Sequence, residues 1–335
     1  MSNRNAEDAA NDGQDRQNHA ISFEAYPQHR FRLGTPVKVR FAVTPPTEVL
    51  LDEFKFGAYL QACEELGFDT LWLSDVPLGP LGDPIISLAF AAAATTKLKL
   101  GMNVVPLGRN PFWVAKQLAQ VDRLSRGRLL VSLVPGLGSP EERAVLGHTI
   151  GNRGEVIDSI IPLFRTWWAG EHVTAEIEGF SFIDVAVEPR PTQEPLEIWL
   201  GGIGPAALDR VARLADGWLT ANATPTEADA GRVEIERRAA EIGRTVDPEH
   251  FGISIPYART EPTEVTVAAV RKRRGTDGDI SQILPVGGKS LKQLVRAHIS
   301  GGLTKFVLRP VAGADVSPWF DELKWLADAV LPSQT

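Results

Sequence analysis

Short runs of apolar residues alternate with longer amphipathic stretches along most of this chain. Eight of these runs predict β-strands, at residues 37–43, 70–74, 98–105, 129–134, 197–200, 217–219, 251–255 and 305–308. Most of them are continuous Val, Ile and Leu segments rather than alternating ones, which is typical of parallel strands buried on both faces.

The stretches between the runs have the spacing of amphipathic helices, as in Phe54, Ala58, Ala62 and Leu66, which recur at every fourth residue. Eight strands that are each followed by a helix are the number that closes a (β/α)8 TIM barrel, and we predict this α/β fold. An open, doubly wound parallel sheet is the alternative, because right-handed crossovers build both folds.

Two stretches are longer than the connections that a barrel needs. After the fourth helix, residues 171–195 contain two strand-like segments around Glu178-Gly179, which predicts a β-hairpin. After the seventh strand, residues 260–288 are mostly polar and end in a short apolar segment at 280–286. Insertions at strand ends often cover an active site, and we expect this of both.

The beginning of the chain differs from the rest. Residues 1–19 are rich in Asn, Asp, Gln and Glu and offer almost nothing to bury, so residues 1–34 are expected to be a disordered tail. This tail has no apolar segment of the kind found in a signal peptide. Residues 35–335 are expected to form one barrel domain.

Composition and charge argue against several classes of protein. The net charge of −7 argues against a nucleic-acid partner, which would meet a basic face, and the short basic run at 271–274 is interpreted as solvated surface. No run of about 18 apolar residues occurs, so no membrane span is expected. Cys63 is the only cysteine, which fits a reducing, cytoplasmic setting. The six histidines lack ligand spacing, so no metal site is expected.

In a barrel of this type, the binding groups lie just after the strand ends. Polar side chains at these positions are Thr44, Ser74, Asp75, Asn103, Thr220, Asn222 and Arg309. Asp75 is the only carboxylate among them and histidine is absent, so the mouth suits a ligand held by backbone groups better than hydrolysis by paired carboxylates. Asp75 and Asn103 are the candidate catalytic residues.

The apolar residues beside these positions are Val76, Pro77, Leu78, Val105, Pro106 and Leu107. Few charges accompany them. We therefore expect a small, moderately apolar organic molecule as the substrate.

Two glycine-rich turns are candidate cofactor sites. The first runs Trp199-Leu200-Gly201-Gly202-Ile203-Gly204-Pro205 and joins a strand to a helix, whose free N–H groups favour a phosphate. The second, Val134-Pro135-Gly136-Leu137-Gly138-Ser139, lets a planar ring approach the backbone. A purely structural role stays open for each, as a tight turn in the first and as a turn with a helix cap at Ser139 in the second.

The first turn also fits the loose dinucleotide pattern G-x-G-x-x-A through Gly202, Gly204 and Ala207. The acid expected at the end of the next strand is missing, because that strand runs into Thr220 and Asn222. An NAD(P)-dependent dehydrogenase is therefore an alternative function.

Several segments, taken in order, resemble the bacterial luciferase-like family of luciferase-like monooxygenases and F420-dependent oxidoreductases. They are residues 62–72, 108–111, 115–117, 122–128, 189–191, 195–202 and 215–218. The likeness covers the chain from about residue 37 to its end. It implies a TIM barrel, a flavin or deazaflavin cofactor and a homodimer.

The turns and the resemblance together give the candidate cofactor-binding residues. They are Asn103, Val104, Gly136, Leu137, Gly138, Arg153, Gly201, Gly202, Ile203 and Gly204. Relatives have a bulge, often a non-proline cis peptide, at the position of Asn103 and Val104, and we expect one here. Arg153 matches an arginine that contacts the flavin phosphate in luciferase, although that arginine is structural in other relatives.

The chain departs from its relatives in one respect that affects the chemistry. Many deazaflavin-dependent relatives read Asp-His after the second strand, where this chain reads Asp75-Val76, and Ser139 stands near the glutamate that sugar-phosphate dehydrogenases use as an acid. Sugar-phosphate oxidation is therefore not expected, and the catalytic acid or base stays open. A non-catalytic flavin-binding barrel is a further alternative.

The resemblance also bears on the cofactor. Gly108-Arg109-Asn110-Pro111 is similar to the deazaflavin branch, which favours coenzyme F420 over FMN. F420 implies hydride transfer, whereas FMN permits monooxygenation.

Overall fold

The computed structural model describes residues 37–147, 153–177, 179–276, 278–311 and 318–335. The tail predicted at residues 1–34 lies outside these residues, so its disorder stays a prediction.

Eight parallel strands close into a barrel. They are β1 (Arg40–Val43), β2 (Thr70–Ser74), β3 (Lys99–Val104), β4 (Leu129–Leu133), β7 (Ile198–Leu200), β8 (Gly217–Ala221), β9 (Phe251–Tyr257) and β10 (Lys305–Pro310). The first strand pairs with both β2 and β10, which confirms the predicted barrel and rules out the open sheet. Each strand overlaps one of the predicted runs, because continuous apolar segments are what a doubly covered parallel sheet requires.

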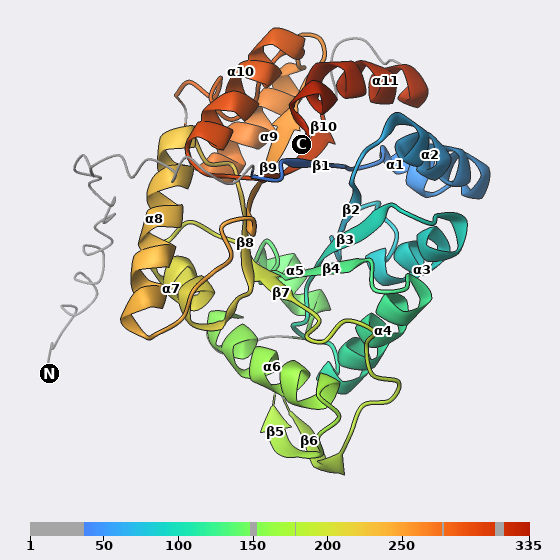
Figure 1. Ribbon diagram of the computed structural model, residues 1–335, viewed down its shortest axis with the longest axis vertical. Helices are drawn as coiled ribbons and strands as arrows, with labels where there is room; N and C mark the ends of the chain where they lie inside the picture. The colour runs from blue at the N-terminus through green and yellow to red at the C-terminus, as the bar shows by residue number, and fades with distance from the viewer. Residues whose placement is uncertain (1–36, 148–152, 178, 277, 312–317) are drawn as a thin grey trace, which may run out of the picture. The chain divides into compact units, whose positions relative to one another are not determined.

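Helices surround the ring of strands (Figure 1). They are α1 (Thr47–Leu50), α2 (Glu53–Leu66), α3 (Pro84–Ala94), α4 (Pro111–Leu124), α5 (Pro140–Val145), α6 (Arg153–Trp168), α7 (Pro205–Leu214), α8 (Pro225–Glu241), α9 (Glu264–Arg274), α10 (Gly287–Ser300) and α11 (Trp319–Val330), with a 3-10 turn at Leu331–Ser333.

Local sequence explains where several helices begin and end. The Asp83 side chain accepts hydrogen bonds from the N–H groups of Ile85 (2.8 Å) and Ile86 (3.2 Å), and Pro84 occupies the first turn of α3. At the other end of α2, Gly67 has a φ of 90°, a left-handed conformation that glycine adopts without steric cost. A side-chain cap and a left-handed glycine therefore mark where α3 begins and where α2 ends.

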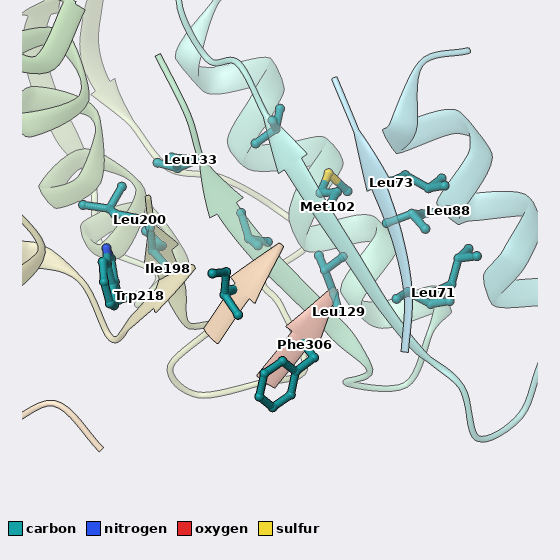
Figure 2. Close-up of a cluster of buried hydrophobic side chains, with 14 of the residues drawn as sticks. Leu71, Leu73, Leu88, Met102, Leu129, Leu133, Ile198, Leu200, Trp218 and Phe306 are labelled. Atoms are coloured by element: carbon teal, nitrogen blue, oxygen red, sulfur yellow. The ribbon is translucent and has the colours of Figure 1, made fainter. Parts of the chain in front are cut away.

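The main core lies between the outer face of the barrel and the helices. Figure 2 shows part of it, where Leu71 and Leu73 of β2 lie near Leu88 of α3, and Met102 lies on the adjoining strand. All four side chains are at most 2% exposed. Cys63 of α2 belongs to the same core, and burial raises the pKa of its thiol.

A second, smaller cluster fills the inside of the barrel. Its buried members are Ala42, Trp72, Trp199, Leu219 and Val307, one from each of five strands. Gly101 and Gly217 make room for the two indoles, since a Cβ at these glycines would lie 2.1 Å from the Trp72 ring and 2.4 Å from the Trp199 ring. The barrel is thus plugged by large side chains, and a ligand is confined to its carboxyl-terminal end.

The two predicted insertions have different structures. The first contains the expected hairpin, β5 (Val173–Ile177) and β6 (Phe180–Val185), although Glu178 of its turn lies outside the described residues. The hairpin packs on α6, where Trp167 lies edge-on to Phe182 and donates its indole N–H to the Val185 carbonyl at 2.9 Å. The second insertion forms α9 and a small apolar cluster of Val270, Ile280, Ile283 and Leu284.

The described part of the chain has neither a membrane-spanning helix nor a cluster of metal ligands. None of its helices is long and apolar enough to cross a membrane. None of its His, Cys, Asp and Glu side chains form a group of three or more that could hold a metal ion.

Candidate functional site

A cavity of about 980 Å³ opens at the carboxyl ends of the barrel strands. Each strand contributes to its lining one of its own residues or the residue that directly follows it, namely Thr44, Ser74, Asn103, Leu133, Gly201, Thr220, Ser254 and Arg309. This is the end of the barrel at which the sequence placed the candidate site, because parallel strands bring all their carboxyl ends to one face.

The floor of the cavity is polar because side chains alternate along each strand. Asn103 comes two residues after Gly101, and Arg309 two residues after Val307, so both point inward above the apolar plug. Their neighbours hold them in place. The Asn103 side-chain amide donates to the Ser74 hydroxyl at 3.1 Å, and the Arg309 Nε donates to the Ser254 hydroxyl at 3.1 Å.

Asp75 lines the cavity, but its carboxylate is engaged. Its Oδ2 accepts a hydrogen bond from the Val105 N–H at 3.0 Å and forms an ion pair with Arg109 at 2.8 Å. Burial raises the pKa of this carboxyl group, and the Arg109 charge acts in the opposite direction. The residue ties the loop after β3 to the end of β2. A catalytic role for Asp75, as for Asn103, stays a prediction.

The turn after β4 is held by two charged side chains. Glu142, which is 3% exposed, accepts a short hydrogen bond from the Gly138 N–H. Arg153 donates to the carbonyls of Pro135 (2.9 Å) and Gly136 (3.1 Å). Both side chains therefore stabilise the turn itself. Arg153 lies outside the cavity lining, and its contact with a phosphate stays a prediction.

The turn between β7 and α7 has the features predicted for an anion site. Gly202 has a φ of 95°, and its carbonyl accepts a hydrogen bond from the Trp218 indole at 2.8 Å. Gly204 precedes α7, whose first residue is Pro205. No hydrogen bond to another described residue involves the N–H groups of Gly202, Ile203 or Gly204. The turn thus offers free donors at a helix N-terminus.

The predicted cofactor residues divide into two sets. Those that line the cavity are Asn103, Gly136, Leu137, Gly201 and Gly202. Those outside its lining are Val104, Gly138, Arg153, Ile203 and Gly204. Val104, Gly138 and Ile203 adjoin lining residues in the chain, Gly204 belongs to the same turn as Gly202, and Arg153 supports the turn after β4.

The expected distortion between Asn103 and Val104 is wrong. The strand β3 pairs in continuous register on both sides, with Asn103 opposite Ser74 and Ser132, and Val104 opposite Leu133. The cis peptides in the described ranges precede Pro189 and Pro195 instead. Ladders on both sides hold β3 in regular geometry up to its last residue.

The expectation of a mouth with few charges is also wrong. The charged side chains in the lining are Glu48, Asp75, Glu142, Arg210, Arg259, Arg273, Glu322 and Arg309. Of the six predicted apolar wall residues, only Val76 lines the cavity, while Val105 is fully buried elsewhere. Most of these charges come from helices that reach the mouth from outside the strand ends, so reading the strand ends missed them.

The insertions differ in their relation to the cavity. None of the described residues in the first insertion lines it, so the expectation that the hairpin covers the site is wrong. The second insertion contributes Thr260 and Arg273, as expected. Arg273 belongs to the basic run that was interpreted from the sequence as solvated surface. The run lies in an insertion at a strand end, and this position was the signal that could have indicated a place at the cavity.

Comparison with known proteins adds to this geometry. A family model for luciferase-like monooxygenases matches residues 41–298. The FMNH2-dependent dimethylsulfone monooxygenase of Pseudomonas fluorescens is 31% identical over 159 residues, which are 46% of this chain and 43% of that protein. The chain matches about half the length of the curated relatives, between 43% and 51%.

Two solved structures share the fold over nearly the whole chain. The coenzyme F420-dependent tetrahydromethanopterin reductase of Methanopyrus kandleri has a TM-score of 0.72 and 18% identity, and the match covers 89% of this chain and 100% of that one. The monooxygenase RslO1 of Streptomyces bottropensis has a TM-score of 0.70 and 21% identity, with 88% and 99% covered. At this identity the likeness shows the fold alone. Together with the family model, which spans most of the barrel, it confirms the resemblance read from the sequence, and the chain belongs to the luciferase-like monooxygenase family.

Proposed function

We propose that this protein is an oxidoreductase that binds a flavin or deazaflavin in the cavity and acts on a small organic molecule beside it. The observation that carries the proposal is a cavity of about 980 Å³ with glycine backbone in two of its walls and a polar floor. Pockets that bury most of a drug-sized ligand measure about 300–1,000 Å³, so there is room for a cofactor and a substrate.

The residues of the cavity fit such a cofactor. A Cβ at Gly201 would lie 2.8 Å from the Leu219 carbonyl oxygen, so this wall admits only bare backbone. Thr220 is fully buried and lines the cavity, and its hydroxyl has no hydrogen-bond partner among the described residues. A bare wall suits a planar ring, and the free amides of the Gly202 turn suit a phosphate.

The chain's own residues would bind and orient this cofactor. The amides of the Gly202 turn would hold the phosphate, and the Asn103 and Ser74 side chains would face the ring from the floor. When bound, F420 would supply a hydride to the substrate, or reduced FMN would supply the reducing power for monooxygenation. Asp75 and Asn103 stay the candidates for moving a proton.

Coenzyme F420 is our first choice of cofactor, because Gly108-Arg109-Asn110-Pro111 is similar to the deazaflavin branch of the family. FMN is the second choice, and the match to an FMNH2-dependent monooxygenase supports it. We expect the purified protein to bind F420 at least about tenfold more tightly than FMN, as measured by fluorescence titration.

Titration with NADPH and the absorbance spectrum of any ligand that copurifies complete this experiment. Tighter binding of FMN would reverse the cofactor assignment. Saturable F420 or FMN binding without turnover on a panel of electrophiles and oxidisable substrates would favour a non-catalytic flavin carrier. Binding of NADPH alone would favour the nicotinamide-dependent alternative.

We also propose that the protein is a homodimer. Large apolar side chains are exposed on the adjacent helices α2, α3 and α4, namely Phe54 (81%), Ile86 (73%), Trp113 (56%) and Phe90 (43%). Apolar patches of this kind mark protein interfaces, and a two-fold axis would pair the patch with itself.

We expect Ile86→Asp to shift the protein from dimer to monomer in sedimentation equilibrium. Val265→Asp, at an equally exposed apolar residue of α9, is the control and should leave the dimer intact. A monomeric wild type would contradict the proposal.

A further inference from the structure

The charges of the cavity are unevenly compensated. Asp75 pairs with Arg109 at 2.8 Å, Arg259 with Glu322 at 3.7 Å, and Arg210 forms a short ion pair with Asp158. Arg273 and Arg309 differ from these, since no carboxylate of the described residues lies within ion-pair distance of either. Two positive charges in the cavity are therefore left without an ion-pair partner among the residues that the structure describes.

Arg309 is the more constrained of the two. It points into the barrel from β10, and its one hydrogen bond to a described residue runs from Nε to the Ser254 hydroxyl. Its terminal amino groups have no such partner. Burial lowers the pKa of Arg309 to about 10, with a further contribution from the charge of Arg273. The guanidinium stays protonated at neutral pH, so the cavity holds a partly desolvated cation, which is unfavourable until an anion meets it.

Arg273 reaches the same region from the insertion. It lies on α9, is exposed, and lines the cavity together with Arg309. Both guanidinium groups line the same cavity, and the charge of Arg273 contributes to the lowered pKa of Arg309, so an anion bound between them would relieve their repulsion. A guanidinium binds a carboxylate or sulfonate through two parallel N–H bonds, which a hydroxyl or an amide cannot reproduce.

The arginine pair lies away from the turn assigned to the cofactor phosphate. That turn follows β7, whereas Arg309 is on β10, and β8 and β9 lie between them. Three strand spacings of about 4.8 Å separate the two positions along the barrel wall. A phosphate in the Gly202 turn therefore leaves the arginines available to another ligand.

We propose that Arg309 and Arg273 form an anion subsite, and that the substrate of this protein carries a carboxylate or sulfonate group. The inference rests on the proposed function in taking this cavity as the active site. It modifies the expectation of a moderately apolar substrate: an organic body lies against the cofactor, and an oxyanion lies at the β9–β10 side of the cavity. Ser254 is the positioning residue that fixes the Arg309 side chain.

The test uses benzoate and benzenesulfonate as probes and benzamide as the neutral counterpart, at constant ionic strength. Binding to the full-length protein is followed by tryptophan fluorescence, because Trp319 lines the cavity. We expect the two anions to bind at least about tenfold more tightly than benzamide. Arg309→Met should remove that preference and leave benzamide binding unchanged, and Arg309→Lys should retain part of it. Arg273→Met should reduce anion affinity about threefold, while Lys272→Met, which removes an exposed charge one residue away, should not.

Equal affinity of the wild type for benzoate and benzamide would overturn the proposal, and so would an unchanged preference in Arg309→Met. If Arg309→Met does not fold, the test rests on the comparison of Arg273→Met with Lys272→Met. Equal affinities of these two variants for benzoate and benzenesulfonate would contradict the anion subsite. FMN and riboflavin are titrated in parallel. A loss of FMN affinity without loss of riboflavin affinity in Arg309→Met would assign the arginines to the cofactor phosphate and overturn the substrate assignment. The probes are titrated with and without cofactor. If the protein binds the anions but neither flavin nor deazaflavin, the proposed function is contradicted and the anion subsite is not.

Discussion

Replacing Asp122 with alanine is expected to lower the free energy of unfolding by about 3 kcal/mol or more. Asp122 is fully buried in α4, and its carboxylate accepts hydrogen bonds from the Thr192 N–H (2.7 Å), the Gln193 N–H (2.9 Å) and the Gln193 side-chain amide (2.7 Å). Hydrogen bonds to a charged group contribute about 1.5–3 kcal/mol each, although Thr192 is exposed enough for water to replace part of the loss. These bonds tie the segment before β7 to the barrel.

The measurement is the melting temperature at a fixed scan rate, since unfolding of a chain of this length is often irreversible. A loss of about 3 kcal/mol corresponds to a decrease of roughly 6–12 °C. Asp122→Asn keeps an oxygen that accepts from the two backbone amides, but its own NH2 group would face the NH2 group of the Gln193 side chain. An intermediate decrease in the melting temperature is therefore expected. Asp328→Ala, at an exposed aspartate of α11, is the control and should change the melting temperature little. Equal melting temperatures for Asp122→Ala and this control would show that the tether does not stabilise the fold.

Replacing Gly202 with valine is expected to weaken cofactor binding by two orders of magnitude or more. The amides around Gly202 are free to hold a phosphate, and removal of two charge-assisted hydrogen bonds, at about 1.5–3 kcal/mol each, accounts for this loss. The structure adds a second reason. Gly202 has a φ of 95°, and a Cβ there would lie 2.7 Å from the Cβ of Ala207, so a β-branched residue must move the turn.

The same strain predicts a modest loss of stability, about 1–3 kcal/mol for a non-glycine residue in this conformation. Gly204→Ala is the matched control, because Gly204 has a φ of −70° and a Cβ there meets no atom within 4 Å. Cofactor titration by fluorescence separates the two variants, and circular dichroism melting reports folding. If Gly202→Val folds and binds cofactor as tightly as Gly204→Ala does, the phosphate lies elsewhere.

Several features of the molecule were determined by its sequence alone. The eight strands, the hairpin around Gly179 and the cap of α2 at Gly67 are local properties, set by hydrophobic pattern and by residues that favour one backbone conformation. Parallel strands of a barrel share one active face, so the sequence also placed Asn103, Gly201 and Gly202 at the cavity.

The regular strand geometry at Asn103 and Val104 could not be predicted from the sequence alone. The expected distortion came from relatives, whereas the outcome depends on the strands that pair with β3 on either side. Register between strands is a non-local property, which the residues of one strand do not specify by themselves.

The charges of the cavity were decided by the tertiary structure. In the basic run of α9, successive side chains are rotated by about 100° around the helix axis, and only packing of the helix on the barrel determines that Arg273, and not Lys272, lines the cavity. Arg309 was visible at a strand end, but whether a carboxylate of the described residues pairs with it depends on which ones the other elements bring within reach. Pattern along the chain therefore determined the barrel and the end at which it binds ligands, because both follow from local burial. The electrostatics of the site arise from side chains far apart in sequence, and only their arrangement in space decides which of them are paired.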